Sequence, residues 1–122
     1  MILVDASVWI DHLRSADAVL IKHLGADNIL VHPFVTGEIA LGHLRQRGLV
    51  VRMLQRQMQA VVATHEEVMQ LIDNESLFGL GIGYIDVHLL ASARLTSSAA
   101  LWTRDKRLRA VADRLGMAAR ID

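Results

Sequence analysis

Short apolar runs alternate along this chain with longer stretches in which apolar residues recur every three or four positions. Four of the runs predict buried strands, and a fifth, weaker run is a further candidate. They are residues 2–4 (ILV), 28–32 (NILVH), 60–63 (AVVA), 99–103 (AALWT) and, as the weaker candidate, 117–121 (MAARI). Because continuous apolar runs suit strands that are covered on both faces, the pattern predicts a mostly parallel sheet.

The stretches between these runs carry signals that start and stop helices. Ser7 and Ser15 are placed to cap the first two helices, Gly48 to break the chain after the third, and Thr64 with Glu67 to form a capping box. The expected helices run from Ser7 past Leu13, from Ser15 to Gly25, and over residues 36–47, 49–59, 64–75, 84–95 and 105–115. Strands that alternate with helices predict an α/β fold with helices on both faces of the sheet.

The composition narrows the class of protein. A chain of 122 residues is expected to form one domain over residues 1–122. The hydrophobic share of 52% and the mean hydropathy of +0.32 suggest an apolar surface for a partner in addition to a core. Aromatic residues make up only 4%, which argues against base stacking as the main way of binding nucleic acid.

The charges are balanced, with 13 Lys and Arg against 13 Asp and Glu. A protein that grips nucleic acid by bulk charge would be basic, so this one would need a local basic patch or metal ions. The chain has no cysteine, which suits a reducing cytoplasm. It has no basic leader of a signal peptide and no uncharged stretch approaching the roughly 20 residues of a membrane span, so we expect no membrane association.

Four acidic residues lie far apart in the sequence, each where a strand passes into a helix or where a helix begins. They are Asp5, Glu38, Asp86 and Asp105, and their neighbours are mostly apolar. In parallel sheets, functional groups gather at the carboxyl ends of the strands, and Asp5 ends the first strand while Asp105 follows the fourth. We therefore expect the four carboxylates to come together at one end of the sheet.

Four carboxylates gathered without a counter-charge raise one another's pKa, and a divalent ion removes that penalty. Oxygen ligands alone favour Mg²⁺ or Mn²⁺ over Zn²⁺. One or two such ions activate water and stabilise the leaving oxygen of a phosphodiester. Ser7 and Thr103 place hydroxyls beside Asp5 and Asp105, where they would hydrogen-bond a carboxylate or a metal-bound water, or else act as plain helix caps.

Each acid also has a purely structural explanation. Asp5, Glu38 and Asp86 fit the first turn of a helix, where the helix dipole stabilises an acid. Asp105 fits the N-cap of its own helix, and this explanation is the strongest of the four. The set of four is therefore more informative than any one member. Asp11 stays undecided, because it lies on the first helix soon after Asp5.

Three further features carry weaker signals. The GLGIG run at residues 79–83 lacks the Lys-Ser/Thr of a phosphate-binding loop, so we interpret it as a hinge before the Asp86 helix. His88 would point away from Asp86 on a helix and is more typical of a structural or surface histidine. The basic run RDKRLR at residues 104–109 is either a solvated helix face or a place for RNA phosphates.

Four segments, in this order, resemble PIN-domain ribonucleases, and among them the VapC-type toxins of bacterial toxin–antitoxin pairs. The segments are VDASVWIDHLR, GEIALGHLR, GIGYIDVHLLASA and LWTRDKRL. The resemblance implies a PIN-like three-layer α/β/α fold with a mostly parallel sheet of four to five strands. It also implies Mg²⁺- or Mn²⁺-dependent cleavage of RNA, a homodimer, and a cognate VapB-type antitoxin that blocks the site.

Carried over to this chain, the resemblance makes Asp5, Glu38, Asp86 and Asp105 the catalytic and metal-binding acids. Ser7 and Thr103 would be supporting catalytic hydroxyls. The RNA target does not carry over, because members of the family cut different RNAs.

Other functions remain to be separated from this one. A haloacid-dehalogenase-like phosphatase needs a second Asp two residues after the first, where this chain has Ser7. A receiver domain needs an Asp at the end of a middle strand, but the third apolar run continues as THEE. A catalytically silent PIN-fold binding module and a DNA-directed metal nuclease stay open, to be distinguished by metal titration and by comparing RNA with DNA cleavage.

Overall fold

The computed structural model of the chain describes residues 1–96 and 99–121. Within these residues, four strands and seven helices follow one another along the chain. The strands are β1 (Ile2–Val4), β2 (Ile29–Val31), β3 (Met58–Gln59) and β4 (Ala100–Trp102). The helices are α1 (Ala6–Arg14), α2 (Ala18–Gly25), α3 (Pro33–Ala40), α4 (Arg47–Arg56), α5 (His65–Asn74), α6 (Tyr84–Leu95) and α7 (Lys106–Arg114).

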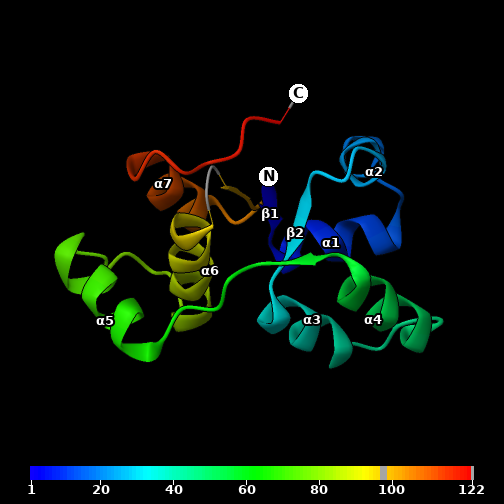
Figure 1. Cartoon of the computed structure of the whole chain (residues 1–122), viewed down its shortest axis with the longest axis horizontal. Coiled ribbons are helices and arrows are strands. Elements are labelled where there is room, and N and C mark those ends of the chain that lie inside the picture. The colour runs from blue at the N-terminus through cyan, green and yellow to red at the C-terminus, as the bar shows by residue number, and fades with distance from the viewer. Residues whose placement is uncertain (97–98, 122) are drawn as a thin grey trace.

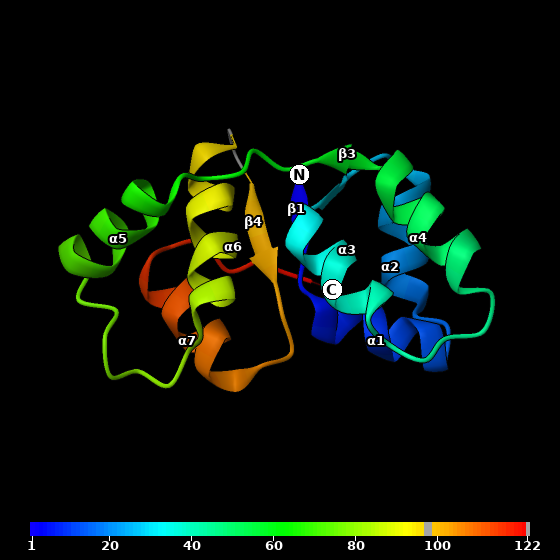
Figure 2. The same ribbon diagram turned by 90° about the horizontal axis from the view of Figure 1, so that it is seen from below.

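The strands form one parallel sheet in the order β3-β2-β1-β4, so that β1 lies between β2 and β4. Helices α1 to α4 connect β1, β2 and β3 on one side of the sheet, and α5 to α7 lie on the other side (Figures 1 and 2). This three-layer α/β/α arrangement confirms the predicted fold class. It also places the carboxyl ends of β1 and β4 side by side, with Val4 opposite Trp102.

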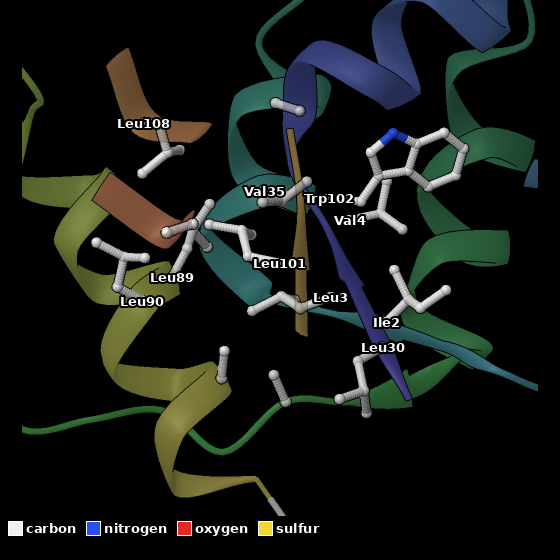
Figure 3. Close-up of a cluster of buried hydrophobic side chains, with 14 of the residues drawn as sticks. Ile2, Leu3, Val4, Leu30, Val35, Leu89, Leu90, Leu101, Trp102 and Leu108 are labelled. Atoms are coloured by element: carbon white, nitrogen blue, oxygen red, sulfur yellow. The ribbon is translucent and has the colours of Figure 1, made fainter. Parts of the chain in front are cut away.

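The core explains why the short strands are continuous apolar runs. Leu3 and Leu101 lie on the side of α6, and Val4 and Trp102 lie on the opposite side (Figure 3). Successive side chains of a strand point to opposite faces, and here both faces are covered by helices. Val4 is fully buried and Trp102 only 8% exposed, so the residues just before the candidate site are held firmly.

The third and fifth strands differ from the prediction. The third strand is Met58–Gln59 rather than residues 60–63, and only the N–H of Ala60 continues the ladder, to the carbonyl of Val31 at 2.9 Å. β2 ends at Val31 because Pro33 opens α3, so residues 61–63 have no strand to pair with. Residues 117–121 contribute a single parallel bridge, Ala118 to Leu101, instead of a strand.

Two helices were also predicted with the wrong bounds, and the end expected at residue 59 comes at Arg56, before β3. The helix expected over residues 36–47 ends at Ala40, and the next begins at Arg47, so Gly48 lies inside its first turn instead of breaking the chain. The break comes at Gln46, whose φ of +51° is left-handed. A glycine in a first turn costs little, because the N–H groups there have no helical partner.

The predicted caps are partly confirmed. The capping box of Thr64 and Glu67 is present, and α6 has the predicted bounds. Asp17 rather than Ser15 caps α2, by accepting a hydrogen bond from the N–H of Leu20 at 2.9 Å. Ser7 lies inside α1 and caps nothing, which leaves its hydroxyl for another use. Among the described residues, no helix is both long and apolar enough to cross a membrane.

Candidate active site

Asp5 is the most firmly held of the four acids. Its N–H donates to the carbonyl of Trp102 at 2.9 Å, which ties the end of β1 to the end of β4, and the residue is only 9% exposed. Its Oδ2 accepts hydrogen bonds from Ser7 Oγ at 2.7 Å and from Thr103 Oγ1 at 2.8 Å. Its Oδ1 accepts none from residues 1–96 and 99–121, so one oxygen is fixed and the other remains open to a ligand.

The two hydroxyls connect Asp5 to the turn between β4 and α7. Ser7 Oγ accepts from the N–H of Arg104 at 3.0 Å, and Thr103 Oγ1 accepts from the N–H of Asp105 at 3.1 Å. The hydrogen bonds to a carboxylate that the sequence predicts for Ser7 and Thr103 are therefore present. Each hydroxyl donates to one group and accepts from another, so neither can rotate freely.

Asp105 stands at the N-cap of α7. Its Oδ1 accepts from the N–H groups of Arg107 at 2.9 Å and Leu108 at 3.0 Å, so the structural explanation offered for Asp105 is realised. Its Oδ2 accepts no hydrogen bond from the described residues. The cap thus orients the carboxylate without using both of its oxygens.

Asp86 lies in the first turn of α6 and is half-buried. Burial raises the pKa of its carboxyl group, the hydrogen bond that Oδ2 accepts from the N–H of Gly83 at 2.9 Å lowers it, and the charges of Asp5 and Asp105 raise it further. The net pKa is raised. Asp86 is therefore close enough to Asp5, at the end of β1, and to Asp105, just after β4, for their charges to repel its own.

Glu38 lies in the second turn of α3, because the helix begins at Pro33, so the first-turn position expected for it is wrong. No described residue hydrogen-bonds its carboxyl group. The residue as a whole is exposed. Partial burial of the carboxyl group nevertheless raises its pKa, and the charges of Asp5 and Asp86 raise it further. Glu38, Asp5 and Asp86 therefore repel one another in all three pairs. Asp86 also repels Asp105, so that repulsion links all four acids.

The four acids lie near one another but do not surround a single point as the ligands of a directly bound metal ion would. Within residues 1–96 and 99–121, no three His, Asp or Glu side chains converge as a directly bound metal ion would require. A Mg²⁺ ion needs less than this, because it keeps several waters and uses one or two carboxylates. The open Oδ1 of Asp5, the oxygen-only donors and the mutual repulsion therefore fit a hard divalent cation.

Sequence reasoning missed the partner of Asp11. Arg104 donates to Asp11 Oδ2 at 2.6 Å and to Asp17 Oδ2 at 2.5 Å, and its guanidinium lies 5.9 Å from the centre of the Trp102 ring. Asp11 therefore belongs to an ion pair at the edge of the site rather than to the four acids. Its partner is 93 residues away, so no local signal could have indicated the pair.

A row of rings beside the site was missed as well. His88 is buried and packs edge-on against Phe34 and Tyr84, and Phe34 packs against His32. Tyr84 Oη and His65 Nδ1 are 2.7 Å apart and share a hydrogen bond. Burial lowers the pKa of His32 to about 4. The row joins α3 to α6, so His88 is a structural histidine, one of the two roles that its position left open.

Comparison with known proteins agrees with this geometry. A model of the PIN domain matches residues 2–114. Over 118 residues the chain is 49% identical to Ribonuclease VapC32 of Mycobacterium tuberculosis, in both strain CDC 1551 / Oshkosh and strain ATCC 25618 / H37Rv. The match covers 97% of this chain and 95% of each relative.

A solved structure of FitAB bound to an IR36 DNA fragment has a similar fold. The TM-score is 0.62, over 93% of this chain and 91% of that chain. At 18% identity this likeness bears on the fold alone. The family model and the near full-length relatives carry the assignment: this chain belongs to the PIN-domain family and, within it, to the VapC type.

Proposed function

We propose that this protein is a Mg²⁺- or Mn²⁺-dependent endoribonuclease that acts in the cytoplasm as the toxin of a type II toxin–antitoxin pair. The observation that carries the proposal is the buried Asp5, whose carboxylate is held by Ser7 and Thr103. Its charge raises the pKa of both Glu38 and Asp86, so the three acids lie near one another. The 49% identity to a protein named Ribonuclease VapC32 supports RNA as the substrate.

Asp5, Asp86, Asp105 and Glu38 would hold the divalent ion, either directly or through the waters that such an ion keeps. Such an ion offsets the negative charge that develops on a phosphodiester and makes water a better nucleophile at neutral pH. Ser7 and Thr103 would hold the Asp5 carboxylate in one orientation, so that its free oxygen faces the ion.

Glu38 is the group best suited to take a proton from the attacking water. Its carboxylate has no hydrogen-bond partner among the described residues, and partial burial and the charges of Asp5 and Asp86 raise its pKa. A general base works best when its pKa approaches the pH at which it operates. Ser7 and Thr103 do not suit this role, because an alcohol oxygen is barely basic and each of the two already accepts a backbone N–H.

The test is cleavage of RNA by the purified protein. Chelation should abolish cleavage, and Mg²⁺ or Mn²⁺ should restore it. Attack by water should leave a 5′-phosphate and a 3′-hydroxyl. Ends carrying a 2′,3′-cyclic phosphate would show attack by the RNA's own 2′-hydroxyl and would rule the mechanism out.

Two alternatives give different results in the same assay. A DNA-directed nuclease would cut a DNA strand of matched sequence at least as fast as the RNA. A catalytically silent binding module would cut neither and would bind Mn²⁺ poorly in a titration.

We further propose a homodimer and a VapB-type antitoxin as partners. Leu41 and Leu49 are 90% and 56% exposed, and such apolar surface is typical of contacts between chains. Val50 and Met53, two further apolar residues of α4, instead pack against the core. The surplus apolar surface in this region is therefore smaller than predicted.

A groove of about 410 Å³ opens beside Glu38 and offers a place for the antitoxin. Its lining combines apolar side chains with two arginines: Ile10, Leu13, Arg14, Glu38, Ile39, Gly42, His43, Leu44, Arg45 and Val50. A basic side chain of a partner lying in this groove could pair with Glu38, the member of the four acids that lines it.

Expression tests the toxin assignment. The wild-type chain expressed alone should stop growth, and co-expression of an antitoxin or the change Asp5→Asn should relieve the effect. Harmless expression of a soluble, active enzyme would contradict the toxin role and leave the nuclease standing. A monomer at micromolar concentration would contradict the dimer.

A further inference from the structure

The arginines on either side of Asp105 are held in opposite ways. Arg104 is paired with Asp11 and Asp17, so its charge is already neutralised. Arg107 is exposed, and its guanidinium makes no ion pair or hydrogen bond within residues 1–96 and 99–121. The basic run that the sequence left undecided therefore contains one paired guanidinium, that of Arg104, and two without a partner among the described residues, those of Arg107 and Arg109.

Arg107 does not extend freely into solvent, because its side chain lies across Gly81. A Cβ built on Gly81 would come within 2.7 Å of Arg107 Nη1 and 2.9 Å of its Cδ. Gly81 also has a φ of +77°, a conformation that side chains with a Cβ rarely adopt. This position thus needs glycine for its backbone and for the room that it leaves to Arg107.

This contact places Arg107 at the rim of the acids. The loop that carries Gly81 continues to Gly83, whose N–H holds Asp86 at 2.9 Å. It reaches the start of α6 beside the first turns of α7 (Figure 2). The backbone of Arg107 itself donates to Asp105 at 2.9 Å. The backbone of Arg107 is therefore held against Asp105, and its guanidinium lies on the loop that leads to Asp86.

We propose that Arg107, seated on Gly81, binds a phosphate of the RNA that neighbours the scissile one. The inference rests on the proposed function and deepens it. The chain has no net charge, so a substrate polyanion needs local cations to approach four acids. The planar guanidinium fork matches a phosphate group, and the glycine seat limits the positions it can take.

The experiment measures cleavage and binding of one single-stranded RNA oligonucleotide. Arg107→Gln should raise KM about tenfold, as expected for the loss of a charged hydrogen bond, and change kcat little. It should also reduce the slope of log affinity against log salt by about 0.7, the value for one phosphate contact in a single strand. Gly81→Ala should act in the same direction by displacing Arg107. Thermal melting would show whether each variant is folded.

Arg109→Gln is the matched control. Arg109 is exposed on the same helix, and two residues along α7 place it on nearly the opposite face. It should leave both KM and the salt slope near wild type. Equal effects of the two changes would mean that only the general charge matters, and this would overturn the proposal.

A second arm locates the phosphate. Neutral methylphosphonate groups are placed one at a time along the RNA, and binding is measured with wild type and Arg107→Gln. One position should remove the difference between the two proteins, as in a double-mutant cycle. A penalty that is the same at every position would overturn the proposal even if wild type cleaves RNA normally.

Failure of the proposed function would look different. A wild type that cuts no RNA would contradict the nuclease, and the binding curves would then decide on Arg107 by themselves. A wild type that cuts RNA while Arg107→Gln keeps the wild-type KM would contradict only the role of Arg107.

Discussion

Asp5 and Glu38 lie in one site and are built in opposite ways. Asp5 is buried, and two hydroxyls fix one of its oxygens. Glu38 is exposed, has no hydrogen-bond partner among the described residues, and has a raised pKa. Asp86 lies between these extremes, with one backbone hydrogen bond and a raised pKa.

The difference shows how a protein can concentrate negative charge without losing its fold. The acid deepest in the structure receives hydrogen bonds that stabilise its charged form. The acids nearer the surface keep an electrostatic cost that a cation or a proton can relieve. Asp5 is therefore an anchor of fixed geometry, and Glu38 and Asp86 form the part of the site that responds to its occupant.

The largest effect should come from removing the charge of the anchor. Asp5→Asn should lower the rate of RNA cleavage about 100-fold or more, because the stabilisation by a metal ion amounts to several kcal/mol. Asp86→Asn should lose most of the activity as well. Steady-state cleavage in Mg²⁺ measures both, and circular dichroism checks the fold. If either variant cuts RNA at nearly the wild-type rate, the substituted residue does not belong to the catalytic site.

The hydroxyls that hold the anchor should have the next largest effect. Ser7→Ala and Thr103→Val should each slow cleavage roughly tenfold and cost about 1–2 kcal/mol of stability, since each removes a hydrogen bond to a charged group. Both bonds end on the same oxygen of Asp5, and the hydroxyl oxygens are 3.4 Å apart. The double variant should therefore lose less than the sum of the two losses. Strict additivity in chemical denaturation would contradict this coupling.

Removing the charge of Glu38 or Asp86 should raise the stability of the metal-free protein, whereas removing either hydroxyl should lower it. A carboxyl group with a raised pKa binds its proton more readily in the folded state, so stability falls as the pH rises from its ordinary pKa through the raised one. Below the ordinary values of 4.5 for Glu38 and 3.8 for Asp86, no such cost is present. In chelator at pH 7, Glu38→Gln and Asp86→Asn should therefore melt slightly higher than wild type.

The gain should stay under about 1 kcal/mol for Glu38, because this residue is exposed and solvent screens its charge. The gain in stability of both amide variants should vanish near pH 3. Saturating Mn²⁺ should reverse this gain, because the ion stabilises wild type alone. Asp113→Asn, which removes a surface acid on α7, should show no such dependence on Mn²⁺. Lower stability of both amide variants in chelator would contradict the repulsion.

The smallest effect should come from Asp11, which lies close to Asp5 in sequence but outside the group of acids. Asp11→Asn breaks one of the two ion pairs of Arg104 and leaves the pair with Asp17. Exposed pairs contribute about 0.2–1 kcal/mol, so stability should change little and cleavage should stay within about twofold. A loss of activity as large as that of Asp5→Asn would move Asp11 into the site.

Much of the fold could be read from the sequence, because its signals are local. The capping box at Thr64 and Glu67, the apolar runs of β1, β2 and β4, and the bounds of α6 depend on residues within one or two turns. The third strand could not be placed in this way. Residues 60–63 are apolar enough for a strand, but the partner strand has already ended at Val31.

The sequence by itself also singled out Asp5, Glu38, Asp86 and Asp105, because an acid with mostly apolar neighbours at the end of a strand or near the start of a helix is locally unusual. Only the tertiary structure decided how they differ. The bond from Thr103 to Asp5 spans 98 residues, and the bond from Arg104 to Asp11 spans 93. Burial, charge repulsion and the choice between an occupied and a free arginine depend on such distant neighbours, which pattern and propensity do not encode.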